Sequence, residues 1–245
     1  MQTLRSLLFV GQMYLAMLIL GLVFLPWVLA SARGAHVACH IYCRWVIWTL
    51  GWMVGLKTEV RGTPPVGAGL VAAKHQSFLD ILLIYHAMPH SAFIMKRILI
   101  YAPILGQYAL RMGCVPVDRG RRSAAIARMR AGVESGRQAG RQVIIYPQGT
   151  RVAPGESRPY KIGTGLLYAQ MGQPCVPVAT NVGVFWPRRG ITRKPGTAVV
   201  EFLAPIPPGL ARAAFMERLE ADIEGASNRL MAEAGFHTDH PGGAL

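Results

Sequence analysis

The sequence predicts an α/β protein: a central mixed β-sheet flanked by helices, preceded by an N-terminal apolar hairpin of two membrane helices. Of its 245 residues, 52% are hydrophobic and only 16% are charged, against about 25% charged residues in an ordinary soluble domain. The first part of the chain is almost uniformly apolar. After Lys57, short β-like runs alternate with helical patterns and are separated by Gly or Pro, which is typical of α/β folds.

The charge balance restricts the class of partner. Lys and Arg total 26 and Asp and Glu total 12, giving a formal net charge of +14. An apolar, basic chain suits an anionic membrane surface or phosphorylated ligands, and its composition excludes disorder. Nucleic acid is the competing interpretation. The basic residues are scattered, however, and aromatics do not alternate with them, so we expect no nucleic-acid partner.

The run from Leu7 to Ala30 contains no charged residue. As one helix it would be about 36 Å long, enough to cross the hydrocarbon of a bilayer. A secretory signal peptide is the alternative, because Ala30-Ser31-Ala32 resembles a cleavage site and Arg5 gives a positive start. The apolar run is longer than the roughly 7 to 15 residues of a signal peptide, so we expect this segment to be retained.

A second apolar stretch, Trp45 to Leu56, contains three tryptophans and is too short to span a bilayer. We interpret it as an interfacial helix that completes a membrane-associated region over residues 1–56. We place the break between the two helices where four polar residues separate the apolar stretches: Arg33, His36, His40 and Arg44. The positive-inside tendency then predicts the inner membrane of the cell as location, with the catalytic body on the cytoplasmic side.

Residues 57–236 are predicted to form the α/β domain, and 237–245 a flexible tail. The expected strands are Thr58–Arg61, Leu70–Ala73, Ala92–Met95, Val115–Val117, Val143–Tyr146, Val176–Ala179 and Ala198–Phe202. The expected helices are Phe78–Ala87, Ile104–Arg111, Arg122–Gln138, Thr164–Gln170 and Leu210–Ala234.

The four cysteines do not form the dense framework of a small secreted protein, which favours a reducing compartment. Cys39 and Cys43 lie one helical turn apart with His40 between them, but no second ligand pair follows at zinc-finger spacing. We interpret these cysteines as core residues and expect no metal site.

A histidine and an aspartate follow one of the predicted strands. His75 lies where the strand ends, and Asp80 is five residues further along. The ends of strands in α/β sheets commonly hold active sites, and a carboxylate that orients an imidazole makes a general-base pair. The alternative is structural, because Ser77-x-x-Asp80 also reads as a helix capping box. The HxxxxD spacing alone leaves both interpretations open.

Two further segments place an arginine after a predicted strand. Arg119 ends the stretch Gly113–Arg119, and Arg151 ends Tyr146–Arg151, where Gly149 allows the backbone to approach a ligand. Two guanidinium groups at consecutive strand ends suit a phosphate. A solvated surface charge is the alternative for each arginine.

In this order and spacing, these segments resemble the motifs of the glycerolipid HxxxxD acyltransferase family, in particular the 1-acylglycerol-3-phosphate (lysophosphatidic acid) acyltransferases. The resemblance covers roughly residues 57 to 205 and the apolar front end. It implies that His75 is the general base and Asp80 its partner. By the same resemblance, residues that bind the substrate phosphate are Arg119, Gly149, Thr150, Arg151 and Lys96.

The resemblance implies transfer of an acyl group from acyl-CoA or acyl carrier protein to the 2-hydroxyl of 1-acylglycerol-3-phosphate, giving phosphatidic acid without a cofactor. The implied partners are a lysophospholipid, an acyl thioester and an anionic membrane; the choice of donor stays open. Candidate contacts to the membrane are Arg121, Arg122, Arg188, Arg189, Arg193 and Lys194.

Two positions depart from the family pattern. The usual Asn before the histidine is Lys74, and the usual Glu of the third motif is Gln148. These departures keep a second acceptor open, another lysolipid such as a lyso-ornithine lipid. A basic, non-enzymatic membrane adaptor is the remaining alternative.

Overall fold

The computed structural model describes residues 1–88, 90–118, 127–129, 131 and 140–237. Its elements in chain order are α1 (Gln2–Val23), α2 (Leu25–Ala30), α3 (Ala32–Val54), β1 (Leu56–Arg61), β2 (Gly69–Ala73), α4 (Leu79–Ala87), β3 (Ala92–Lys96), the 3₁₀ helix η1 (Arg97–Tyr101), α5 (Leu105–Arg111), β4 (Val115–Val117), β5 (Gln142–Ile145), α7 (Gly163–Met171), β6 (Cys175–Thr180), α8 (Val182–Phe185), β7 (Gly196–Phe202) and α9 (Arg212–Glu233).

The described strands form one mixed sheet in the order β1-β7-β6-β2-β5-β3-β4. Every neighbouring pair is parallel except β6 and β7, which are antiparallel. The strands β2 and β5 are central and buried along their whole length, so both read as continuous apolar runs rather than as alternating patterns. The predicted fold class, a mixed sheet flanked by helices after an apolar front end, is confirmed.

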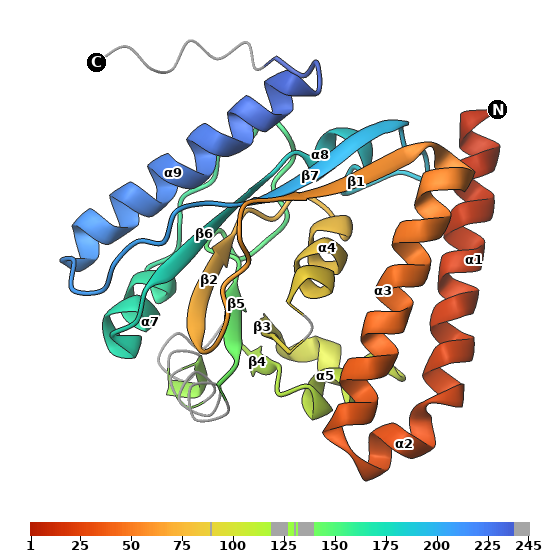
Figure 1. Cartoon of the computed structure of the whole chain (residues 1–245), viewed down its shortest axis with the longest axis horizontal. Helices are drawn as coiled ribbons and strands as arrows, with labels where there is room; N and C mark the ends of the chain where they lie inside the picture. The colour runs from red at the N-terminus through yellow and green to blue at the C-terminus, as the bar shows by residue number, and fades with distance from the viewer. Residues whose placement is uncertain (89, 119–126, 130, 132–139, 238–245) are drawn as a thin grey trace.

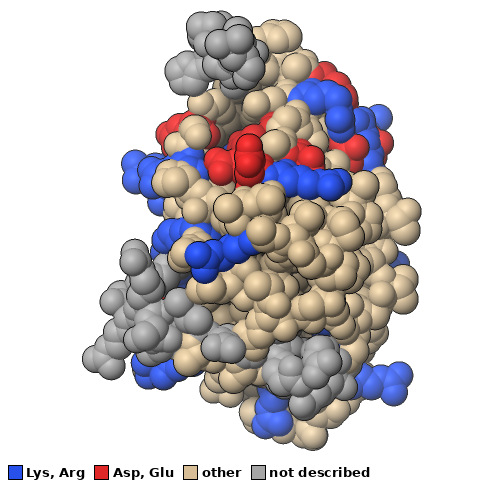
Figure 2. Space-filling model, turned by 90° about the vertical axis from the view of Figure 1, so that its left-hand side faces the viewer, with Lys and Arg blue, Asp and Glu red and all other residues tan. Residues whose placement is uncertain are grey.

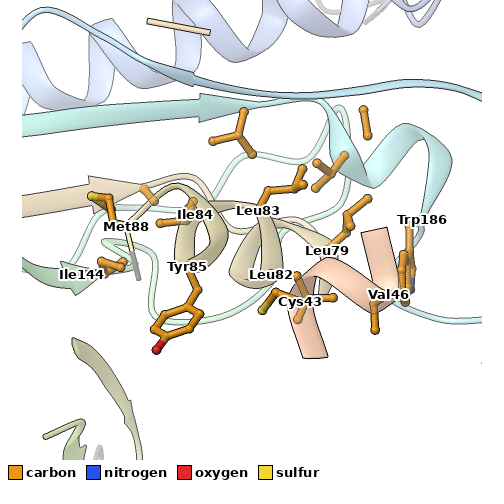
Figure 3. Packing of buried hydrophobic residues seen from close by; sticks show 14 of the residues in the cluster. Cys43, Val46, Leu79, Leu82, Leu83, Ile84, Tyr85, Met88, Ile144 and Trp186 are labelled. Atoms are coloured by element: carbon orange, nitrogen blue, oxygen red, sulfur yellow. The ribbon is translucent and has the colours of Figure 1, made fainter. Parts of the chain in front are cut away.

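Helices cover both faces of the sheet (Figure 1). On one face lie α1, α3, α4 and α5, whose buried side chains form one core cluster with the sheet. On the other face, α7 and α9 pack over a second cluster. Figure 3 shows the first cluster from close by, where Leu79 and Leu82 of α4 lie against Cys43 and Val46 of α3 and against Trp186.

The predicted boundaries of the front end are wrong. The helix expected over Leu7 to Ala30 is interrupted, because α1 ends at Val23 and Pro26 stands in the first turn of α2. Proline has no N–H to continue the α1 hydrogen-bond ladder. The second helix, expected from Trp45, begins at Ala32 after Ser31, whose side chain accepts from the Arg33 N–H at 3.2 Å.

The supposed break between the two helices is one stripe of α3. Arg33, His36, His40 and Arg44 are spaced by three, four and four residues, so all four lie along one side of a helix. The stripe meets α4, where His40 stacks on His86 with ring centroids 5.0 Å apart and His36 Nδ1 is 3.0 Å from the Tyr85 hydroxyl.

The body follows the predicted elements closely, with differences of one to a few residues at their ends. Two short elements were not predicted, η1 and α8. Most of the helix predicted over Arg122–Gln138, and the tail beyond His237, lie outside the described residues.

Candidate active site

His75 lies directly after β2 and is held by Asp80 at the start of α4. The distance from His75 Nδ1 to Asp80 Oδ1 is 2.8 Å. The second carboxylate oxygen of Asp80 accepts the backbone N–H groups of Gln76 and Ser77, each at 2.8 Å. Asp80 is fully buried, whereas the His75 side chain is 14% exposed. The two interpretations of this carboxylate are therefore compatible, since one oxygen caps the turn and the other orients the imidazole.

The geometry determines which ring nitrogen can act. An ionised carboxylate only accepts hydrogen bonds, so Asp80 favours the tautomer of His75 with the proton on Nδ1. The lone pair is then on Nε2, the ring nitrogen that does not contact Asp80. The backbone carbonyl of His75 accepts the Val152 N–H at 2.8 Å, which ties the histidine to the segment after β5.

Tyr146 supports the ring of His75, with ring centroids 4.0 Å apart and nearly parallel planes. Burial and the neighbouring Asp80 carboxylate raise the pKa of the Tyr146 phenol well above its usual range, so this group stays protonated. Tyr146 begins the motif Tyr146–Arg151, but the motif itself indicates no role for the tyrosine. A stack between positions 75 and 146 has no local signal in the sequence.

A cavity of about 840 Å³ connects these residues with the apolar helices. Five of the predicted site residues line it, namely His75, Lys96, Gly149, Thr150 and Arg151. Arg119 lies outside the described residues. The sixth predicted residue inside the described chain, Asp80, is buried behind His75. The structure therefore brings together every predicted site residue that it describes.

Apolar side chains of α1, α3, α4 and α5 make up much of the remaining lining. From α1 the lining residues are Val10, Met13, Tyr14, Met17, Leu20 and Gly21. Their spacing of three or four residues places them on one side of α1. Gly21 is required there, because a Cβ would lie 2.5 Å from Cγ2 of Ile104, and its carbonyl accepts the Tyr108 hydroxyl at 2.9 Å. The front end is thus a wall of the cavity.

The polar end of the cavity is rich in guanidinium groups. Arg188 is exposed and donates to the Arg151 carbonyl at 3.2 Å. Arg193, predicted as a membrane contact, is instead buried: its guanidinium lies 4.6 Å from the centroid of Trp186 and donates to the carbonyls of Gly190 and Ile191. Of the other predicted membrane contacts, Arg189 and Lys194 are exposed, and Arg121 and Arg122 lie outside the described residues.

Gly149 has φ +69°, a backbone conformation that favours glycine. A Cβ at this position would also lie 3.1 to 3.2 Å from the Lys161 side chain. A residue larger than glycine would therefore strain the turn that presents Thr150 and Arg151 to the cavity.

The cavity also contains the cysteine Cys114. Burial raises the pKa of the Cys114 thiol to about 11, so this cavity cysteine stays protonated and weakly reactive near neutral pH. Among the residues that the structure describes, no group of three or more His, Cys, Asp or Glu is placed to hold a metal ion.

Lys74 and Gln148, the two departures from the family pattern, are buried, and neither of these described residues lines the cavity. Both contact Glu224 of α9 instead. Neither side chain is therefore placed to select the acceptor by direct contact.

The chain resembles known proteins along most of its length. It is 29% identical over 161 residues to 1-acyl-sn-glycerol-3-phosphate acyltransferase of Pseudomonas aeruginosa, covering 65% of this chain and 63% of that protein. It is 28% identical over 188 residues to the Cocos nucifera protein of the same name, covering 76% and 60%. The chain thus spans somewhat under two thirds of each of these relatives.

A crystal structure has the same fold: the 1-acyl-sn-glycerophosphate (LPA) acyltransferase PlsC of Thermotoga maritima, with a TM-score of 0.79 and 21% identity, covering 95% of this chain and 98% of that one. The sequence pattern of the Acyltransferase family matches residues 57–181, just over half of the chain and the part that carries His75, Asp80 and Gly149–Arg151. The chain belongs to the Acyltransferase family.

Proposed function

We propose that this protein moves a fatty acyl group from an acyl thioester to the 2-hydroxyl of 1-acylglycerol-3-phosphate, giving phosphatidic acid. One observation carries the proposal: a single cavity joins the Asp80-bound His75, the basic side chains of Lys96 and Arg151, and an apolar chamber. These three parts match the reacting hydroxyl, the phosphate and the acyl chains of the two substrates. The names of the relatives agree with this choice.

The proposed reaction begins with proton transfer from the 2-hydroxyl to Nε2 of His75. The hydroxyl oxygen bonds to the thioester carbonyl carbon and forms a tetrahedral oxyanion. When the oxyanion collapses, the carbon–sulfur bond breaks and His75 returns the proton to the leaving thiolate, so the products are an ester and a free thiol. Asp80 stabilises the transient imidazolium. The reaction proposed here needs no cofactor besides the thioester co-substrate.

The phosphate is assigned to the basic end of the cavity. Arg151 and Lys96 line it beside Gly149 and Thr150, and a guanidinium can grip two phosphate oxygens at once. Arg119 keeps this role from the resemblance alone. Whether acyl-CoA or acyl carrier protein brings the acyl group is left to experiment.

A membrane location accounts for the exposed apolar surface. α1 is about 33 Å long and contains an 18-residue stretch with a mean hydropathy of 2.1. Among the described helices it alone has the length and composition of a membrane span. Trp48 and Trp52 of α3 are 59% and 64% exposed, as expected for an interfacial belt. Phe9 and Met13 are buried in the protein core, which supports a retained helix over a cleaved leader.

The location that we propose is therefore the inner membrane, with the body on the cytoplasmic side. The first acidic residue of the chain is Glu59, so the front end would meet anionic headgroups without repulsion, and each well-placed Lys or Arg would add about 1 kcal/mol.

The test is thioester consumption by purified protein with a panel of defined lysolipids, for the wild type and His75→Ala. We expect preference for lysophosphatidic acid, and a loss of about 10²-fold or more in His75→Ala because the general base is missing. Pelleting with vesicles should be unchanged in the variant. Equal rates with all lysolipids would overturn the proposed acceptor, and no consumption with any of them would favour the adaptor.

A further inference from the structure

A polar cluster around Glu224, whose side chain is 27% exposed, lies next to the site on the side of the sheet that α9 covers. Lys74 Nζ lies 2.6 Å from both carboxylate oxygens of Glu224. Gln148 Nε2 donates to one of these oxygens at 3.4 Å, and the Tyr160 hydroxyl donates to the same oxygen at 2.9 Å. The Lys74 side chain is 2% exposed. Three segments distant in sequence thus meet at one carboxylate.

The residues that meet at Glu224 immediately precede the proposed site residues. Lys74 is next to His75, and Gln148 is next to Gly149. A shift of either backbone would move the imidazole or the phosphate-binding turn, and displacements of about 1 Å can cost about 100-fold in rate.

The residue after His75 is also held by α9. Gln76 Nε2 donates to Sδ of Met231 at 3.4 Å, and Gln76 Oε1 accepts the Gly183 N–H at 2.9 Å. Met231 lies seven residues, about two helical turns, after Glu224, so both contacts come from one side of α9. The helix therefore fixes the chain on both sides of His75.

The charges in the cluster explain the two departures from the family pattern together. One buried ammonium needs one carboxylate, because an unpaired buried charge is strongly unfavourable. Glu224 supplies that carboxylate. A glutamate at position 148 would place a second carboxylate beside Glu224, and one lysine would have to pair with both. The amide of Gln148 avoids this repulsion, because it donates a hydrogen bond to Glu224.

We infer that Glu224 is a positioning residue for acyl transfer, which aligns His75 with the Gly149–Arg151 turn through Lys74 and Gln148. The inference rests on the proposed function. Glu224 does not touch the substrates in this account, so its loss lowers kcat through His75 and leaves the KM of the thioester nearly unchanged, while a displaced Gly149–Arg151 turn raises the KM of the phosphorylated acceptor.

The experiment is a charge swap in the full-length protein, with kcat and KM measured below the thermal midpoint of every variant. Glu224→Gln removes the carboxylate that contacts Lys74 and leaves only the electrostatic interaction with Glu220, and Gln148→Glu adds a second carboxylate to the contact. We expect each single change to lower kcat about tenfold or more with the KM of the thioester within twofold. The double variant Gln148→Glu/Glu224→Gln again has one carboxylate, one amide and one lysine, and should regain kcat to within about threefold of wild type.

Asp222→Asn is the matched control, because it removes a carboxylate from the same helix. Asp222 is paired with Arg218 at 3.6 Å on the surface, and we expect kcat within twofold of wild type. Hydrogen exchange of residues 74–77 and 148–151 gives a second readout if a variant is unstable. We expect faster exchange there in both single variants and wild-type exchange in the swap.

Several outcomes would overturn the inference. These are a swap no better than its single variants, a Glu224→Gln variant with wild-type kcat, or a loss confined to the KM of one substrate. If the wild type is active and His75→Ala is not, these outcomes overturn the role of Glu224 alone. A wild type that consumes no thioester overturns the proposed function and this inference with it.

Discussion

At the scale of single residues, Asp80 shows why a short motif cannot be assigned one role. The HxxxxD spacing fits both a helix cap and a catalytic partner, and the carboxylate makes both sets of contacts because its two oxygens point in different directions. The turn N–H groups hold Asp80 rigidly, so His75 inherits a fixed orientation. Local structure and proposed chemistry depend on the same atoms.

The prediction for a single residue concerns the role of Arg151 in binding the phosphate. Arg151→Ala should raise the KM for lysophosphatidic acid about 10- to 100-fold, because a hydrogen bond to a charged group contributes about 1.5–3 kcal/mol. The KM for the acyl thioester should stay within about twofold. Steady-state kinetics with each substrate varied in turn makes the measurement. Arg189→Ala is the control, because Arg189 is exposed and is not among the described residues that line the cavity. If Arg151→Ala raised the KM of both substrates equally, a phosphate role for Arg151 would be contradicted.

At the scale of elements, the contact between α3 and α4 depends on stacked histidines. His40 and His86 face each other at 5.0 Å, and neither Nδ1 atom has a hydrogen-bond partner among the described residues. Burial, together with His40 and Arg44, lowers the pKa of His86. Burial likewise lowers the pKa of His40, so the neutral forms of these two stacked imidazoles are favoured.

This lowered pKa predicts that acid weakens the folded state. The unfolded chain binds a proton at His86 near pH 6.5, whereas the folded protein binds it only at lower pH. Stability is therefore complete above about pH 6.5 and falls as the pH drops toward the pKa of the folded state. In detergent, the thermal midpoint should be lower at pH 5.5 than at pH 7.5.

The matched variant for this prediction is His86→Gln, which does not titrate. The difference between the two midpoints should shrink in it, although its midpoint at pH 7.5 can be lower through lost packing. An unchanged difference would show that His86 is not the group responsible.

At the scale of the whole molecule, charge is distributed unevenly. Figure 2 shows the side turned away from α1 and α3, where acidic side chains gather in one band. Five of the acidic residues belong to α9: Glu217, Glu220, Asp222, Glu224 and Glu233. The apolar helices, which contain no acidic residue, lie at the opposite end (Figure 1). This polarity suits a molecule that meets an anionic bilayer with its front end.

The whole-molecule prediction concerns the wall that α1 contributes to the cavity. Met17 lines the cavity, so Met17→Trp should fill part of the space proposed for an acyl chain. Rates with the longest acyl thioesters should fall about tenfold relative to short ones, within the range that a misfit of one methylene produces. The measurement is a series of donors of increasing chain length.

Leu18→Trp is the control on the same helix. Leu18 is 49% exposed and points away from the cavity, so the chain-length profile should match that of the wild type. A shift in the control as large as that in Met17→Trp would mean that α1 acts on the substrate only through the membrane.

The sequence by itself was enough to predict the α/β class, nearly all strand positions and five of the residues that line the cavity. These features depend on local patterns: apolar runs, Gly and Pro between them, and motifs a few residues long. The meaning of Lys74 and Gln148, the stack of Tyr146 on His75 and the true extent of α3 came only from the tertiary structure. The first two depend on side chains that lie tens of residues or more apart in the chain, and contacts of that kind leave no periodic trace in a single sequence. The polar stripe of α3 is periodic in the sequence, but only its contact with α4 shows that the stripe belongs to a helix interface and not to a break.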